Sequence, residues 1–223
     1  MDVELRVAAS ADAARRGAAE AIAAAVRRGG HVAVSGGSIP GPTYELAATI
    51  APDWSAVELW FADERCVPPE DERSNYRLVR ERLLDRLERE PVVHRARGEL
   101  PGAEAADLYD GKLDGVTLDL ALLGIGPDGH TASLFPNDPS LDELQRRTVA
   151  VSRAEVDRVT LTLPVLRGAA EVVFLAVGAD KADAIRRAFV EPPGPETPAS
   201  LVRSAAGITY AFLDPAAAET LEV

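Results

Sequence analysis

The segment of the sequence best suited to chemistry is a glycine-rich run that contains His130, one of three histidines in the chain. His130 follows the apolar residues 118–123 and the flexible segment Gly-Ile-Gly-Pro-Asp-Gly. An imidazole titrates near neutral pH, which makes histidine a natural general base. Asp128 stands two positions earlier and offers a carboxylate to orient the ring. We favour this functional interpretation over a loop histidine that only bonds to the backbone.

A second polar segment contains Gly36, Gly37 and Ser38, between a predicted strand and a predicted helix. Glycines let backbone N–H groups approach an anion, the helix N-terminus attracts negative charge, and Ser38 adds a hydroxyl donor. The segment matches neither a P-loop nor a GxGxxG fingerprint, so it does not indicate a nucleotide. An anion site and an ordinary tight turn explain it equally well.

A third polar segment, Asp63-Glu64-Arg65, closes the predicted strand 57–62. A carboxylate and a guanidinium at the end of a strand could orient a water molecule and hold a phosphate group. Taken alone, the tripeptide is explained better by a surface ion pair, which contributes little to stability.

The other residue types give little support to metal or serine chemistry. The three histidines and the single cysteine show no paired ligand spacing, so we expect no metal site. No GxSxG segment is present, which argues against a serine hydrolase. We interpret Cys66 as a small buried residue, and we expect structural roles for His31 and His94 because both lie in predicted strands.

The elements that must position these segments alternate between strands and helices. We expect strands at 31–35, 57–62, 118–123, 148–151, 158–163, 172–177 and 207–213, with His94 in a further short strand. We expect helices from Ser10 to Arg28, at 43–50, 75–87, 103–113 and 181–190, and after Pro215. This pattern predicts an α/β fold, a three-layer α/β/α arrangement in which a Rossmann-like, largely parallel sheet has helices on both faces. The three polar segments should then converge at one edge of the sheet.

Length and charge exclude several classes of protein. The 223 residues include 24 Lys and Arg against 36 Asp and Glu, a formal net charge of −12. We therefore expect no binding to nucleic acid or to an anionic membrane, and no apolar run is long enough to span a bilayer. A single domain over residues 1–223 fits this length. One lone cysteine and the lack of a signal peptide indicate a cytoplasmic location.

An ordered set of motifs makes the sequence recognisable. It comprises SGGSIP (35–40), WFADERCVPPEDERSNYRL (60–78), LALLGIGPDGHTASLFP (120–136), RVTLTLPVL (158–166), the segment of Gly178 and Lys181, and PAS (198–200). Over nearly the whole chain this set resembles the glucosamine-6-phosphate isomerase/6-phosphogluconolactonase superfamily. The resemblance implies the fold described as NagB/RpiA/CoA transferase-like.

The resemblance also implies an activity and a set of site residues. The activity is hydrolysis of 6-phospho-D-glucono-1,5-lactone to 6-phosphogluconate, the second step of the oxidative pentose phosphate pathway, without a cofactor. His130 matches the family's catalytic base, and Asp63 matches the carboxylate that assists it. Positions that match the sugar-phosphate pocket are Gly36, Gly37, Ser38, Arg65, Arg158 and Lys181. The expected partner is the sugar-phosphate lactone alone, with the chain a monomer or weak homodimer.

Two rival functions are weaker. Glucosamine-6-phosphate deaminases of this superfamily carry a histidine segment similar to GHIAFNEP, whereas this chain has GHTASLFP. A non-catalytic sugar-phosphate sensor would need an attached DNA-binding module, and we find neither a spare segment nor a basic patch. Since the expected substrate is an anion and the chain is acidic, recognition must come from a local basic pocket. Arg65, Arg158 and Lys181 are the cations expected there.

Overall fold

The apolar run at 118–123 lies at the centre of a parallel sheet in the computed structural model, which describes residues 3–37 and 40–221. This part of the chain forms a seven-stranded sheet in which every neighbouring pair is parallel. In sheet order the strands are β1 (Val3–Val7), β10 (Ile208–Leu213), β9 (Glu171–Ala176), β6 (Leu120–Leu123), β2 (Gly30–Val34), β3 (Val57–Phe61) and β5 (Val92–His94). The predicted parallel α/β fold is confirmed.

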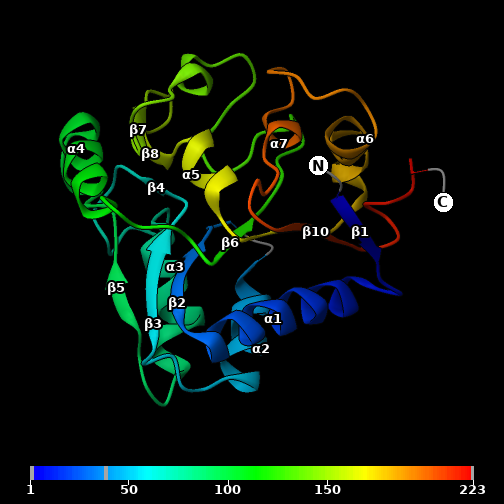
Figure 1. The fold of residues 1–223 in the computed structure, drawn as a ribbon, viewed down its shortest axis with the longest axis horizontal. Coiled ribbons are helices and arrows are strands. Elements are labelled where there is room, and N and C mark those ends of the chain that lie inside the picture. The colour runs from blue at the N-terminus through cyan, green and yellow to red at the C-terminus, as the bar shows by residue number, and fades with distance from the viewer. Residues whose placement is uncertain (1–2, 38–39, 222–223) are drawn as a thin grey trace.

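Helices cover both faces of this sheet (Figure 1). On one face lie α1 (Ala11–Arg28), α2 (Pro40–Ile50) and α3 (Asn75–Arg82). On the other lie α4 (Gly102–Lys112), α5 (Leu163–Gly168), α6 (Ala182–Phe189) and α7 (Pro198–Leu201). Short 3-10 turns occur at η1 (Leu84–Arg86), η2 (Pro139–Asp142) and η3 (Ala179–Lys181). None of the helices in the described part is long and apolar enough to cross a membrane.

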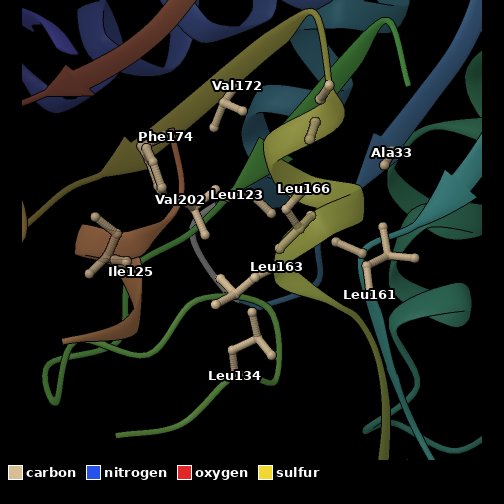
Figure 2. Close-up of a cluster of buried hydrophobic side chains, with 14 of the residues drawn as sticks. Ala33, Leu123, Ile125, Leu134, Leu161, Leu163, Leu166, Val172, Phe174 and Val202 are labelled. Carbon is tan, nitrogen blue, oxygen red and sulfur yellow. The ribbon is translucent and has the colours of Figure 1, made fainter. Parts of the chain in front are cut away.

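The described core consists of two clusters, one on each face of the sheet. Because side chains alternate along a strand, Leu120 and Leu122 of β6 enter one cluster while Ala121 and Leu123 enter the other. All four are buried, as expected for a central strand covered on both faces. Figure 2 shows the cluster that contains Leu123, in which the α5 side chains lie over the strands.

A second, smaller sheet supplies part of the cavity described below. It is antiparallel, with the strand order β4 (Asp63–Arg65), β8 (Arg158–Leu161) and β7 (Thr148–Val151). The sequence located the two later strands but did not separate them from the main sheet. The strand predicted at 158–163 ends at Leu161, because Pro164 lies in the first turn of α5.

Other predicted boundaries hold or shift for local reasons. Ser10 caps α1 by accepting a hydrogen bond from the N–H of Ala13, and Gly29 ends the helix with a φ of 76°. The helix predicted at 75–87 ends at Arg82 and continues only as a 3-10 turn. The helix predicted after Pro215 is wrong, because the described residues there form only turns.

The buried carboxylate of Glu64 fixes the start of α3 against β4. It accepts hydrogen bonds from the N–H groups of Asn75, at 2.7 Å, and Tyr76, at 2.8 Å. It also accepts one from the N–H of Arg65 at 2.7 Å. The Asn75 and Tyr76 donors belong to the N-terminus of α3, where a negative charge is favourable. Glu64 therefore sets where Asn75 enters the site.

We predict that Glu64→Ala lowers the free energy of unfolding by about 2–3 kcal/mol, because it leaves buried N–H donors without an acceptor. Urea unfolding followed by circular dichroism measures the change. Glu81→Ala is the matched control on the same helix, since it removes only an exposed pair with Arg77. Equal effects of the two variants would contradict the tethering role of Glu64.

Candidate active site

A cavity of about 190 Å³ opens where the chain leaves the carboxyl ends of β2 and β6. All three polar segments contribute to it, so the structure brings together the loops that the sequence singled out. Ser38 lies outside the described residues. The cavity is lined by Ser35, Gly36, Gly37, Pro40, Asp63, Arg65, Asn75, Gly124, Ile125, Gly126, Pro127, His130, Ala132, Arg158 and Lys181.

The loop after β6 holds His130 at the cavity between two buried anchors. Ile125 and Leu134, on either side of the histidine, are almost fully buried in the cluster of Figure 2. Ala132 has a φ of 49°, a left-handed conformation that is uncommon for a residue with a side chain. Such strained positions gather at functional sites. The loop is thus held by its apolar ends while its polar middle lines the cavity.

Asp128 fixes the orientation of the His130 ring. Its Oδ1 lies 2.6 Å from Nδ1 of the imidazole and also accepts a hydrogen bond from the His130 N–H at 3.1 Å. Burial alone would raise the pKa of the Asp128 carboxyl, but the hydrogen bonds and charge of His130 outweigh it and lower that pKa. An ionised carboxylate only accepts, so Nδ1 donates. In the neutral ring, Nε2 is then an acceptor with a free lone pair.

Gly126 packs directly against this ring. A Cβ atom at this position would lie 2.1 Å from Nδ1 of His130 and 2.6 Å from Oδ1 of Asp128. Real Cβ atoms do not approach so closely, so a side chain here would displace the Asp128–His130 pair.

Asp63 is buried, which corrects the interpretation of its tripeptide as a surface ion pair. The Ser133 hydroxyl donates to its Oδ2 at 2.6 Å, and the Asn75 amide donates to its Oδ1 at 3.1 Å. The residue is only 6% exposed. Neutral donors therefore hold a carboxylate at the wall of the cavity, with no cation bonded to it in the described part of the chain.

Asn75 is a site residue that the sequence reasoning missed. Besides its bond to Asp63, its Oδ1 accepts a hydrogen bond from Nη1 of Arg65 at 2.5 Å. A Cβ atom on Gly36 would lie 1.7 Å from the same Oδ1, so only glycine fits there. One local signal exists, since Asn75 directly follows the expected cap residue Ser74. Its contacts across 10 and 12 residues become visible only in the fold.

Arg65 and Arg158 face each other across the pair β4–β8, where their Cα atoms are partners in the register. Burial lowers the pKa of Arg158, and the charge of Arg65 adds to this effect. The buried Nε atoms of both residues have no hydrogen-bond partner within the described chain. Two guanidinium groups are thus held together at a cost that a bound anion would offset.

Lys181 brings a third cation to the same cavity. Its side chain is 12% exposed, and Nζ lies 3.1 Å from Oδ2 of Asp180. It reaches the cavity from the turn η3, which begins after Gly178 at a φ of 103°. The described part of the cavity therefore combines Arg65, Arg158 and Lys181 with His130.

The remaining histidines and the cysteine lie outside this cavity. His31 accepts a hydrogen bond from the Trp60 indole at 3.1 Å, and His94 stacks on Trp60 with a centroid distance of 4.1 Å. These contacts agree with the structural roles expected from the sequence. Cys66 is only partly buried, contrary to the expectation of a buried residue, and desolvation raises its pKa to about 11. A thiol with such a pKa is a poor nucleophile at neutral pH.

Two solved structures share the fold of this chain. A monomeric glucosamine-6-phosphate deaminase described as a missing link of the NagB superfamily has the same fold, with a TM-score of 0.87 at 19% identity over 97% of this chain and 99% of the deaminase. A 6-phosphogluconolactonase structure from Trypanosoma cruzi is similar over 100% of this chain and 99% of its own, with a TM-score of 0.88 and 25% identity.

Sequence comparison then gives the family. Residues 6–211 match the family Glucosamine-6-phosphate isomerases/6-phosphogluconolactonase, and the chain belongs to it. A 6-phosphogluconolactonase of Homo sapiens is 41% identical over 206 residues, which cover 85% of this chain and 80% of the human protein. The resemblance inferred from the ordered motifs is confirmed at the level of the family.

We predict that Gly126→Ala displaces the His130 ring and breaks its hydrogen bond with Asp128. Gly124→Ala is the matched control in the same loop, because a Cβ there meets nothing within 4 Å. Crystal structures of the two variants provide the measurement. An unchanged Asp128–His130 contact in Gly126→Ala would show that the tight packing does not position the ring.

Proposed function

We propose that this chain is a 6-phosphogluconolactonase, which hydrolyses 6-phospho-D-glucono-1,5-lactone to 6-phosphogluconate in the cytoplasm. The observation that carries the proposal is the single cavity in which an oriented imidazole faces three cations. An imidazole with a free Nε2 suits the activation of water, and clustered cations suit a phosphate group. The relatives that are named for this activity support it.

In the first chemical step, Nε2 of His130 takes a proton from a water molecule as the oxygen of that water attacks the lactone carbonyl carbon. The carbonyl π bond opens and gives a tetrahedral intermediate with a negative oxygen. Asp128 stabilises the resulting imidazolium through Nδ1 and does not itself need to accept the proton. A lactone is an activated ester, so no covalent enzyme intermediate is required.

In the second step the intermediate collapses and the bond between the former carbonyl carbon and the ring oxygen breaks. The imidazolium returns its proton to the departing ring oxygen, which becomes the hydroxyl group of the open product. The carbon retains two oxygens, one from water, and leaves as a carboxylic acid that ionises. Gly36 and Gly37 line the cavity, where their N–H groups would donate to the developing negative oxygen.

The phosphate group does not react and serves to bind and orient the substrate. Arg65, Arg158 and Lys181 would bind it, which offsets the repulsion between the two guanidinium groups and orients the carbonyl toward His130. Asp63 is held by Asn75 and Ser133 at the same wall, where its carboxylate would accept a hydrogen bond from the attacking water or from a sugar hydroxyl.

The purified protein is expected to accelerate hydrolysis of 6-phosphogluconolactone above the spontaneous rate, measured by coupling product formation to 6-phosphogluconate dehydrogenase. His130→Ala should lower kcat by about 10²–10⁴-fold, the usual contribution of a positioned base. His31→Ala is a matched control outside the cavity. If the wild-type rate equals the buffer rate and glucosamine 6-phosphate is deaminated instead, the proposal is wrong.

The variant Asp128→Asn tests how the carboxylate orients the base. The hydrogen bonds and charge of His130 lower the pKa of Asp128, so its carboxylate stays charged at neutral pH and supports the imidazolium. Without that charge, kcat should fall by about tenfold or more, and the acidic limb of the kcat–pH profile should move to lower pH. A profile that keeps both its height and its midpoint would contradict this role.

Arg158→Ala tests the phosphate site. Loss of a hydrogen bond between charged groups costs about 1.5–3 kcal/mol, which corresponds to a rise of about 10- to 100-fold in KM. Arg153→Ala is the control, because that guanidinium lies over the Phe135 ring and outside the cavity lining. Steady-state kinetics give both values. Equal KM changes in the two variants would remove Arg158 from the phosphate site.

A further inference from the structure

We propose that Arg187 is a positioning residue that clamps the backbone just before His130 and ties it to α6, the helix that follows Lys181. This inference rests on the proposed function for its kinetic consequences, but its structural basis is independent of any substrate. Arg187 lies in the second half of α6, outside the cavity lining, and neither composition nor motif spacing drew attention to it.

The Arg187 guanidinium donates to two successive carbonyls of the His130 loop. Nη2 donates to the carbonyl oxygen of Pro127 at 3.1 Å, and Nη1 donates to that of Asp128 at 3.3 Å. The same Nη1 donates to the Thr197 hydroxyl at 3.0 Å. A planar guanidinium presents its donors in a rigid fork, so this arrangement fixes the direction of both peptide groups.

The next carbonyl is held from the same side. The oxygen of Gly129 accepts a hydrogen bond from the N–H of Ala199 at 3.0 Å. Gly129 has a φ of 90°, and a Cβ there would lie 2.9 Å from Cγ2 of Thr197 and 3.3 Å from Nη1 of Arg187. The three carbonyls that precede His130 are therefore all bonded to Arg187 or to the start of α7, with no room for a larger residue between them.

α6 joins this clamp to Lys181, a cation that lines the same cavity. Lys181 is the residue that precedes α6, and Arg187 lies six positions later, a rise of about 9 Å along a helix. Lys181, which lines the cavity, thus lies at the start of this short helix, and Arg187, which bonds to the His130 loop, lies near its end. α6 therefore sets the distance between Lys181 and the imidazole of His130.

The neighbouring Arg186 distinguishes the clamp from ordinary surface pairing. Both arginines bond to Asp183, Arg186 through Nη2 at 3.0 Å and Arg187 through Nε at 2.9 Å. The other partner of Arg186 is Glu191 on the surface, whereas Arg187 reaches the loop. Removal of either arginine costs an exposed ion pair, but only removal of Arg187 releases the carbonyls.

The test compares Arg187→Ala with Arg186→Ala by steady-state kinetics and by crystal structure. We expect Arg187→Ala to lower kcat by about 10- to 100-fold with KM changed less than about threefold, because a misplacement of about 1 Å can cost about 10²-fold. Its acidic kcat–pH limb should also shift, since the Asp128–His130 pair is no longer held. Arg186→Ala should keep kcat within about twofold. Arg187→Lys keeps the charge but only part of the hydrogen bonding, so its kcat should lie between those of Arg187→Ala and Arg186→Ala.

An Arg187→Ala enzyme with the kcat, KM and pH profile of Arg186→Ala would overturn the proposal. If Arg187→Ala does not fold, Thr197→Val removes one partner of the clamp and should lower kcat in the same direction, and an unchanged kcat would overturn the proposal. If the wild-type protein lacks lactonase activity, the proposed function fails, and the displacement of residues 127–130 in the Arg187→Ala crystal structure still tests the clamp.

Discussion

The parallel pairing of β2 with β6 is the constraint on which the site depends. These strands are neighbours in the sheet, with Val32 opposite Leu120 and Ala33 opposite Ala121, so their carboxyl ends lie side by side. After β2 the chain passes to α2 on one face, whereas the chain after β6 packs into the cluster on the other face. Ligands of open α/β sheets bind at such a switch point. The glycine segment and the His130 loop begin at these neighbouring strand ends. Because the chain then passes to opposite faces of the sheet, both segments line one cavity.

The small antiparallel sheet adds the charged groups to this position. β4 follows β3 almost directly and pairs with β8, which places Arg65 opposite Arg158 and leaves Asp63 at the wall. Glu64 and Asn75 then attach α3 to the same strand. The chain has a net charge of −12, yet the cavity is locally cationic. Backbone pairing and short helices position its cations, although the overall field of the chain is negative.

How much could be predicted from the sequence depended on whether a feature is local. His130, Asp128 and the glycine segment carry their own signals, and the alternation of elements predicts that their loops share one edge. The pairing of β4 with β8 could not be predicted, because register between distant strands leaves no local pattern. β1 was missed although Val3, Leu5 and Val7 alternate with charged residues, since at the edge of the sheet its burial is slight. Asn75 and Arg187 act through contacts of 10 to 60 residues in separation, which no spacing reveals.

The helix expected after Pro215 shows the opposite error. Three successive alanines follow Pro215 and favour a helix by propensity. The Asp214 carboxylate accepts a hydrogen bond from the N–H of Ala217, as the cap residue of a helix does, and another from the N–H of Gly178. These local signals account for the expectation, but the described residues after Asp214 form only turns. The hydrogen bond from Gly178 to Asp214 attaches this segment to the residue just before η3, the turn that carries Lys181.

A crystal structure with 6-phosphogluconate bound tests the central claim most directly, because it locates both ends of the product in one measurement. We expect the phosphate group within hydrogen-bond distance of Arg65, Arg158 or Lys181 and the carboxylate within reach of Nε2 of His130. A product bound in the reverse direction, or outside the cavity between β2, β6 and β4, would contradict it.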